Sequence, residues 1–307
     1  MALVWKIAGS FLLPITIVYL LIRFCGRKKL CLRNKVVLIT GASSGLGEAC
    51  AHAFYRAGCK LILAGRRGKE LQRVKDDLLT KTDVKNDKVH PPELAVLDIT
   101  DASSLQEKMA SIVALYGVLD ILINNAGISY RGEIEHTNMD VYRKLMEVNF
   151  FGQIALTKEI LPVMVQQKKG MIVFISSMQG KVSIPYRSAY SSAKHALQAF
   201  SDCLRAETAE RGVDVCVVSP GYISTNLSRN AVRGDGSLHG VIDKTTASGM
   251  TPQEAAQAVL QTVTYRHQDV VLSSITHKLA IYIRTLLPSL FFWIMLKRAK
   301  KYRDENK

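Results

Sequence analysis

From Lys35 onward, short apolar runs rich in β-branched residues alternate with longer amphipathic stretches. The runs are almost continuously apolar, which is typical of parallel strands covered by helices on both faces. The expected strands are Val36–Thr40, Leu61–Ala64, Leu94–Leu97, Ile121–Ile123, Met171–Ile175, Val213–Val218 and Asp269–Leu272. The expected helices begin near Gly45, Lys69, Ser103, Val141, Ala189 and Pro252. The pattern predicts an α/β fold with a doubly wound sheet of seven mainly parallel strands and helices on both faces.

The N-terminus carries a second kind of pattern. Residues 7–22 contain no charge and would span about 24 Å as a helix. A basic cluster follows this segment, which favours a transmembrane signal-anchor at residues 1–25, a basic linker at residues 26–34 and a cytosolic catalytic domain. A cleaved signal peptide is the alternative, although Pro14 and the position of the basic cluster fit it less well.

Two later segments depart from the strand and helix alternation. Residues 224–250 are glycine-rich with few apolar runs, which favours a substrate-binding loop or lid over a simple connection. Residues 276–307 are apolar and end in a basic tail, with Pro288 dividing the apolar part. This C-terminal segment fits an interfacial membrane helix or a buried subunit contact.

The net charge of +15 would suit a polyanionic partner, but it is concentrated behind the two apolar ends of the chain. No motif that combines basic and aromatic residues accompanies it, so we expect no nucleic-acid binding. The six cysteines have neither paired nor metal-ligand spacing, and we expect reduced thiols and no metal site.

The first candidate site follows the first expected strand, which ends in Thr40 and leads into a glycine-rich turn before a helix. Glycines there allow the backbone to approach a pyrophosphate, and the amides at the helix N-terminus favour its charge. The spacing is G-x-x-x-G-x-G rather than the commoner G-x-G-x-x-G. The candidate phosphate-binding residues are Gly41, Ser43, Ser44, Gly45, Leu46 and Gly47.

The end of the second strand bears on the choice of cofactor. An acidic residue there grips the ribose hydroxyls of NAD, whereas a basic residue suits the extra phosphate of NADP. This chain has Arg66 followed by Arg67 and no carboxylate. NADP(H) bound through Arg66 is therefore favoured and NAD(H) remains possible, unless both arginines are simply solvated turn residues.

The strongest constellation is Ser177, Tyr190 and Lys194. Tyr190 and Lys194 are four residues apart on an expected helix, so phenol and ammonium share one face. The cation favours the phenolate, which makes proton transfer feasible near neutral pH. Ser177 ends a strand at the sheet edge where open α/β folds bind ligands, and its hydroxyl suits a substrate oxygen.

Together these motifs resemble those of the short-chain dehydrogenase/reductase family, with a Rossmann-type domain over residues 35–275. The resemblance implies a catalytic tetrad of Asn149, Ser177, Tyr190 and Lys194, with Lys194 also binding the nicotinamide ribose. Asn149 would hold a water in a proton relay, and Asp98 would contact the adenine. The implied remaining cofactor contacts are Asn125, Ala126, Gly127, Pro220, Gly221, Ile223 and Thr225. Within the family, the anchor resembles that of members assigned to the endoplasmic reticulum membrane as single-pass proteins, often with a lumenal domain.

The expected activity is hydride transfer between NADP(H) and a carbonyl or secondary alcohol, with Tyr190 as the acid or base. The anchor favours a lipophilic small-molecule substrate, such as an acyl ketone, steroid or retinoid, with membrane lipid as a partner. The family resemblance implies a homo-oligomer. The alternative function is a non-catalytic, cofactor-binding scaffold or sensor at the membrane.

Overall fold

The computed structural model describes Val18, residues 29–81 and residues 90–305. The strands are β1 (Val36–Thr40), β2 (Lys60–Gly65), β3 (Glu93–Val96), β4 (Ile121–Asn124), β5 (Tyr130–Arg131), β6 (Gly170–Ile175), β7 (Val213–Pro220), β8 (Val232–Arg233) and β9 (Asp269–Leu272). The α-helices are α2 (Gly45–Arg56), α3 (Gly68–Lys81), α4 (Ala102–Ala114), α5 (Met139–Met146), α6 (Gly152–Gln166), α7 (Ser188–Thr208), α8 (Lys244–Ala247), α9 (Pro252–Thr264), α10 (Ile275–Leu286) and α11 (Pro288–Glu305). The shorter helical turns are η1 (Glu147–Phe151), η2 (Met178–Gly180) and η3 (Ala209–Arg211).

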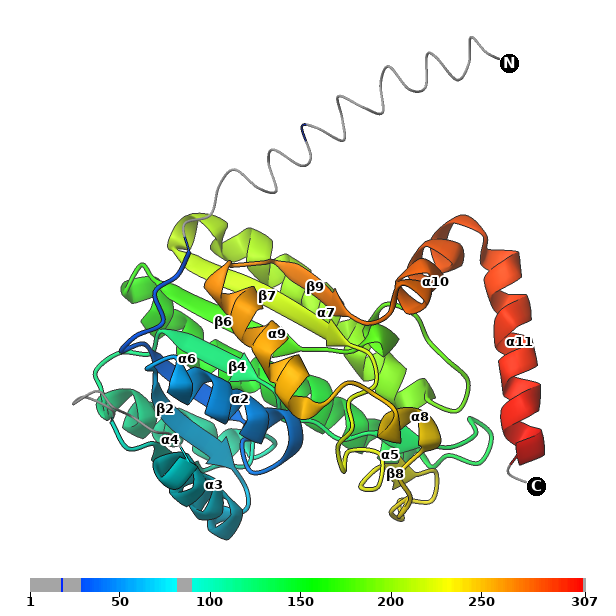
Figure 1. The fold of residues 1–307 in the computed structure, drawn as a ribbon, viewed down its shortest axis with the longest axis horizontal. Helices are drawn as coiled ribbons and strands as arrows, with labels where there is room; N and C mark the ends of the chain where they lie inside the picture. The colour runs from blue at the N-terminus through cyan, green and yellow to red at the C-terminus, as the bar shows by residue number, and fades with distance from the viewer. Residues whose placement is uncertain (1–17, 19–28, 82–89, 306–307) are drawn as a thin grey trace.

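Seven of these strands form one sheet in the order β3-β2-β1-β4-β6-β7-β9, and every neighbouring pair is parallel. The predicted doubly wound sheet is thus confirmed (Figure 1). The chain builds outward from β1 in one direction and then from β4 in the other. This reversal creates a crevice beyond the carboxyl ends of β1 and β4, which is where open α/β sheets bind ligands.

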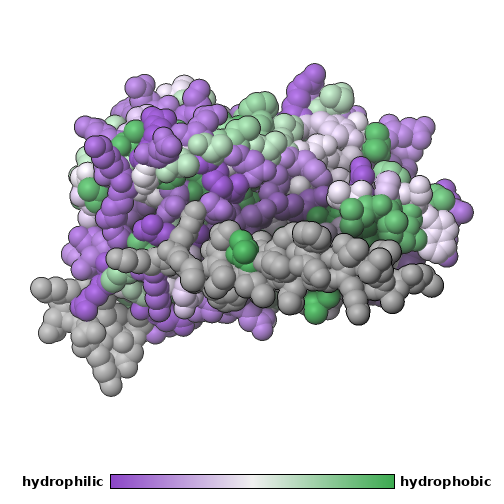
Figure 2. Space-filling view, turned by 90° about the horizontal axis from the view of Figure 1, so that it is seen from above, coloured by the Kyte–Doolittle hydropathy of each residue, from purple (hydrophilic) through white to green (hydrophobic). Residues whose placement is uncertain are grey.

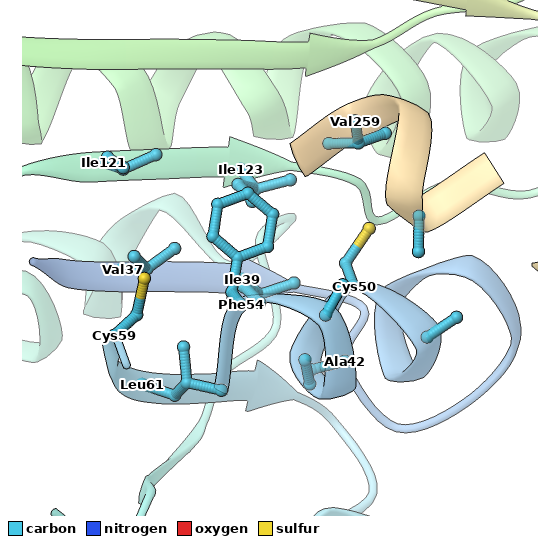
Figure 3. Close-up of a cluster of buried hydrophobic side chains, with 14 of the residues drawn as sticks. Val37, Ile39, Ala42, Cys50, Phe54, Cys59, Leu61, Ile121, Ile123 and Val259 are labelled. Carbon is cyan, nitrogen blue, oxygen red and sulfur yellow. The ribbon is translucent and has the colours of Figure 1, made fainter. Parts of the chain in front are cut away.

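Two layers of helices cover the sheet because side chains along each strand alternate between its faces. Val37 and Ile39 of β1 face the cluster that contains Phe54 of α2 and Val259 of α9, as Figure 3 shows. Val36 and Leu38 belong instead to the cluster on the other face, with apolar side chains of α4, α6 and α7. Burial on both faces explains why the strands are continuously apolar.

The helix expected near Val141 has a more elaborate form than the sequence indicated. Helix α5, the π-helical turn η1 and helix α6 follow one another without a break from Met139 to Gln166. Pro162 lies inside α6. π-Helical turns are rare and occur frequently at functional sites, and η1 contains Asn149.

The segment at residues 224–250 and the C-terminus form structures of their own. Strand β8 pairs in parallel with β5 in a separate two-stranded sheet, and α8 follows it. Helices α10 and α11 form a hairpin at one end of the molecule (Figure 1). No helix in the described ranges has both the length and the apolar character needed to span a membrane. The expected N-terminal anchor at residues 1–25 lies outside the described residues, apart from Val18.

Candidate active site

A cavity of about 890 Å³ lies at the carboxyl ends of the central strands. It gathers residues from β1, β2, β6, β7 and helix α7, together with the loop after β4 and the segment at residues 224–250. Among the described residues that the sequence singled out, only Gly47 and Asn149 do not line it. The fold therefore brings the predicted cofactor and catalytic residues to one place.

The glycine-rich turn between β1 and α2 forms one wall of the cavity. Gly41 and Gly45 have positive φ angles of 66° and 59°, a conformation that side-chain-bearing residues rarely adopt. A Cβ atom at Gly47 would meet the Gly41 carbonyl and would lie 2.6 Å from Asn125 Nδ2. Asn125 Nδ2 donates to the Thr40 carbonyl at 2.9 Å, which fixes the turn to the end of β4.

This turn fits a dinucleotide pyrophosphate. Ser44 is the N-cap residue of α2, and within the described chain its side chain makes no capping hydrogen bond. The first backbone amides of α2 are therefore available to bind a phosphate, and the glycines leave room for it beside the turn. Thr225, from the segment after β7, approaches the same turn, because a Cβ atom at Gly45 would lie 3.3 Å from its Cγ2 atom.

The two arginines after β2 occupy different positions. Arg67 donates to the Ser43 hydroxyl at 2.9 Å and to the Ser44 hydroxyl at 3.0 Å, so its guanidinium lies beside the phosphate turn. The side chain of Arg66 is 66% exposed, and its Nη1 atom lies 3.8 Å from Asp98 Oδ2. The sequence pointed to Arg66 as the contact of a 2′-phosphate, and this stays a prediction. The structure adds that Arg67 is the arginine bonded to the turn. Only side-chain direction distinguishes these neighbours, and the sequence does not give it.

The proposed catalytic side chains converge on the end of β6. Tyr190 and Lys194 lie one turn apart on α7 and are 7% and 4% exposed. Lys194 Nζ donates to the Ile175 carbonyl at 2.8 Å and lies 5.9 Å from the centroid of the Tyr190 ring. Ser177 follows β6 and its hydroxyl accepts a hydrogen bond from the Gln179 amide at 3.1 Å. The hydroxyl, phenol and ammonium groups thus all border the cavity.

Burial changes the acidity of this pair. It raises the pKa of Tyr190 above the usual value of a phenol, whereas the hydrogen bond with Ser177 and the charge of Arg131 lower it. Burial also lowers the pKa of Lys194 to about 8, because the desolvated ammonium is less stable than in water. Arg131 is therefore a cation near Tyr190 that sequence reasoning missed.

Asn149 lies behind the cavity wall and is fully buried in η1. Its Oδ1 atom accepts a hydrogen bond from the Ile128 amide, and its Nδ2 atom donates to the Ile128 carbonyl, both at 2.9 Å. This pair of bonds fixes the loop between β4 and β5 at Ile128, which lines the cavity. Asn149 thus supports the backbone between the cofactor turn and the catalytic helix.

A buried ionic cluster links the segment at residues 224–250 to the catalytic region. Arg131 Nε donates to Asp243 Oδ2 at 2.8 Å, and Arg187 approaches the same carboxylate at 3.5 Å. His239 Nε2 lies 3.1 Å from the other carboxylate oxygen. Burial raises the pKa of Asp243, but Arg131 and Arg187 together bring it below the usual value of an aspartate. Arg131 and Asp243 are 112 residues apart, so no local pattern could reveal this cluster.

The remaining implied cofactor residues lie around the end of β7. Pro220 ends the strand, and the Gly221 amide donates to the Leu272 carbonyl at 2.8 Å. Ile223 forms an isolated parallel bridge with Met250, which ties the start of the 224–250 segment to its end. All three residues line the cavity.

Comparison with known proteins places this chain in one family. The family model for short chain dehydrogenases matches residues 35–235. The chain therefore belongs to the short-chain dehydrogenase/reductase family and is a nicotinamide-dependent oxidoreductase. Its curated relatives include Dehydrogenase/reductase SDR family protein 7-like of Drosophila melanogaster, which is 51% identical over 296 residues covering 96% of this chain and 90% of that protein. Dehydrogenase/reductase SDR family member 7B of Mus musculus is 52% identical over 280 residues, covering 91% of this chain and 86% of that protein.

Solved structures show the same fold. A short-chain dehydrogenase from Streptomyces avermitilis superposes with a TM-score of 0.71 at 31% identity, covering 86% of this chain and 97% of that one. An alcohol dehydrogenase from the archaeon Thermococcus sibiricus, complexed with 5-hydroxy-NADP, gives a TM-score of 0.67 at 25% identity, covering 79% of this chain and 97% of that one. The cavity therefore occupies a fold that other dehydrogenases use.

Proposed function

We propose that this protein is a membrane-anchored reductase that uses NADPH to reduce the carbonyl group of a lipophilic substrate. The observation that carries the proposal is the convergence of Ser177, Tyr190 and Lys194 on a cavity that is also lined by the phosphate turn and Arg67. A phenol, a hydroxyl and a cation arranged in this way suit proton transfer to a carbonyl oxygen. The glycine-rich turn suits the dinucleotide.

The basic end of β2 supports a preference for NADP(H). Arg67 lies against Ser43 and Ser44, and Arg66 lies at the rim of the same wall. Together these residues offer guanidinium and hydroxyl donors that suit a 2′-phosphate. The neighbouring carboxylate, Asp98, accepts hydrogen bonds from Thr100 and is left to contact the adenine.

The catalytic residues have separate proposed roles. Bound NADPH supplies the hydride that reaches the carbonyl carbon. Tyr190 donates its phenolic proton to the carbonyl oxygen, and Ser177 orients that oxygen by a hydrogen bond. Lys194 stabilises the resulting phenolate and binds the nicotinamide ribose, while Asn149 holds the nearby backbone and a relay water. Burial keeps Tyr190 protonated at neutral pH, which suits the reductase direction.

The 224–250 segment supports a lipophilic substrate. Its side chains on the cavity wall include Leu227, Leu238 and Ile242, which are 42%, 66% and 43% exposed. Apolar side chains that remain this accessible beside a cavity offer surface for an apolar ligand. An acyl ketone, a steroid or a retinoid has this character, and a protein at the endoplasmic reticulum membrane would meet such molecules in the bilayer.

Substitution of Arg67 by Ala tests the cofactor preference. A hydrogen bond to a charged group contributes about 1.5–3 kcal/mol, so the variant should have a KM for NADPH roughly tenfold to a hundredfold higher, with the KM for NADH almost unchanged. Initial rates with both cofactors measure this. The matched control is Arg56→Ala on α2, whose guanidinium donates to the His52 carbonyl in the same helix. Equal losses with NADPH and NADH in Arg67→Ala would contradict the NADP(H) assignment.

The substrate class is tested by NADPH oxidation with purified protein. Long-chain acyl ketones, steroids and retinal should support turnover, while short water-soluble ketones of the same reactivity should have much lower kcat/KM. Higher kcat/KM with the short ketones would rule out a lipophilic substrate.

A further inference from the structure

The hairpin of α10 and α11 presents a large apolar outer surface. On α10, Ile275, Leu279, Tyr282 and Leu286 are 77%, 51%, 63% and 72% exposed. Their spacing of four, three and four residues places them on one face of the helix. On α11, Leu290, Trp293 and Leu296 continue the surface. Figure 2 shows apolar surface gathered at this end of the molecule.

The inner side of the same hairpin is attached to the protein. Phe291 is 4% exposed and belongs to a cluster with Met178 and Val182. The Tyr186 hydroxyl donates to the Ala299 carbonyl at 3.1 Å, and the Tyr186 ring stacks on Tyr302 with centroids 4.3 Å apart. All these partners lie between Ser177 and Tyr190. The hairpin is therefore fixed on one side to the segment that joins two proposed catalytic residues, while its apolar outer side stays exposed among the described residues.

The hairpin is cationic up to Arg303, and its two acidic residues, Asp304 and Glu305, lie at the end of α11. No acidic residue occurs between Asp269 and Asp304. The cations in that interval are Lys278, Arg284, Lys297, Arg298, Lys300, Lys301 and Arg303. Lys297 Nζ lies 3.7 Å from the centroid of the Trp293 ring, and the Arg284 guanidinium lies 4.9 Å from that of Phe292. Aromatic and aliphatic side chains rimmed by Lys and Arg are typical of a helix that lies in a membrane interface.

The same charge distribution opposes a second copy of this chain as the occupant. A symmetric dimer would bring the patch against itself and so would oppose cations with cations. Protein interfaces are also depleted of lysine at their cores. On an anionic bilayer, the lipid phosphates instead pair with these cations. The apolar side chains of the outer face can then lie where the headgroups meet the acyl chains.

We infer that the outer face of the α10–α11 hairpin docks on an anionic lipid bilayer. The proposed contact does not depend on the proposed catalysis. Since the inner face of α11 contacts residues 178–187, docking brings the segment between Ser177 and Tyr190 close to the membrane surface.

Trp293 is a built-in reporter, because the chain contains two tryptophans and the other is Trp5. The full chain carrying Trp5→Phe is mixed with phosphatidylcholine vesicles with brominated acyl chains, with or without phosphatidylglycerol. Trp293 emission should be quenched with phosphatidylglycerol and much less without it. Absence of quenching, or equal quenching in both vesicles, would overturn the proposal. A blue shift of Trp293 emission that appears without lipid as the protein concentration rises would also overturn the proposal, because it would show that a second copy covers this face.

The contribution of the cations to lipid binding is tested by adding Lys300→Gln and Arg303→Gln together to the Trp5→Phe chain. Each juxtamembrane cation strengthens binding about fivefold, so half-quenching should need on the order of twentyfold more anionic lipid. The control is Lys158→Gln with Arg211→Gln, two exposed cations on α6 and η3. NADPH binding should be unchanged in both double variants. An equal shift in the control, or no shift in the hairpin variant, would contradict docking by this face.

Discussion

Burial acts on Tyr190 and Lys194 in opposite directions. It raises the pKa of the phenol and lowers that of the ammonium to about 8, so it favours the neutral form of each group. The spacing of the two residues was visible in the sequence, but their burial was not. Two contributions to the acidity of Tyr190, the hydrogen bond with Ser177 and the charge of Arg131, follow from the tertiary structure.

Arg131 gives a prediction at the residue scale. In the alcohol-oxidation direction Tyr190 must be a phenolate, and activity rises as pH increases through its pKa. Replacing Arg131 by Leu removes a charge that lowers this pKa, so the rise should move to higher pH. The pH profile of kcat/KM for oxidation measures the shift.

Arg131→Lys is the matched variant, since it keeps the charge and should keep the midpoint of the profile. A purely structural role for Arg131 would lower the plateau of activity in Arg131→Leu and leave the midpoint in place. That outcome would contradict the electrostatic role.

The elements of the central sheet were largely predictable because burial on both faces leaves long apolar runs. The start of α9 was also predictable, since Thr251 is its cap residue and Pro252 follows directly; Thr251 also forms a capping box with Glu254 inside the helix. Helix α6 was not foreseen as a separate element, because a π-helical turn joins it to α5 without a polar break. Strands β5 and β8 pair through two residues each, too few to leave a periodic signal.

The turn between β1 and α2 gives a prediction at the element scale. Gly47→Ala places a methyl group against the Gly41 carbonyl and Asn125, which forces α2 away from the turn. The free energy of unfolding should fall by about 1–3 kcal/mol. NADPH affinity should fall at least roughly tenfold, because the amides of α2 no longer face the pyrophosphate. Denaturant unfolding and cofactor titration measure the two effects.

The control for this substitution is Gly117→Ala. Gly117 has a φ of 70°, and within the described structure an added Cβ there would meet nothing within 4 Å. This variant should lose about 1 kcal/mol through backbone strain alone and should bind NADPH normally. Normal NADPH affinity in Gly47→Ala would show that the close approach of α2 to the turn is not needed for the cofactor.

At the scale of the whole molecule, the fold collects distant residues at one sheet edge. Asp243 ties the 224–250 segment to Arg131 and Arg187, and the hairpin reaches Arg187 through Tyr302, whose ring lies 5.7 Å from the guanidinium. The catalytic cavity is therefore connected to the C-terminal helices by contacts that no local sequence pattern records. The cytosolic placement of the catalytic domain remains a prediction from the charge that follows residues 7–22.

Glycosylation tests that prediction. Asn226-Leu227-Ser228 is an acceptor sequence, and Ala206→Asn would create a second one ahead of Glu207 and Thr208 on the exposed side of α7. A cytosolic domain predicts that glycosidase leaves the gel mobility of both the native chain and the variant unchanged in cell-derived protein. A mobility shift in either chain would place the domain in the lumen.

The central claim is that Tyr190 donates the proton in an NADPH-dependent carbonyl reduction. The most direct measurement is turnover of Tyr190→Phe beside its affinity for NADPH. The variant lacks only the hydroxyl, so NADPH should bind nearly as in the native protein while kcat for carbonyl reduction falls at least roughly a hundredfold. Full NADPH-dependent turnover in Tyr190→Phe would contradict the claim.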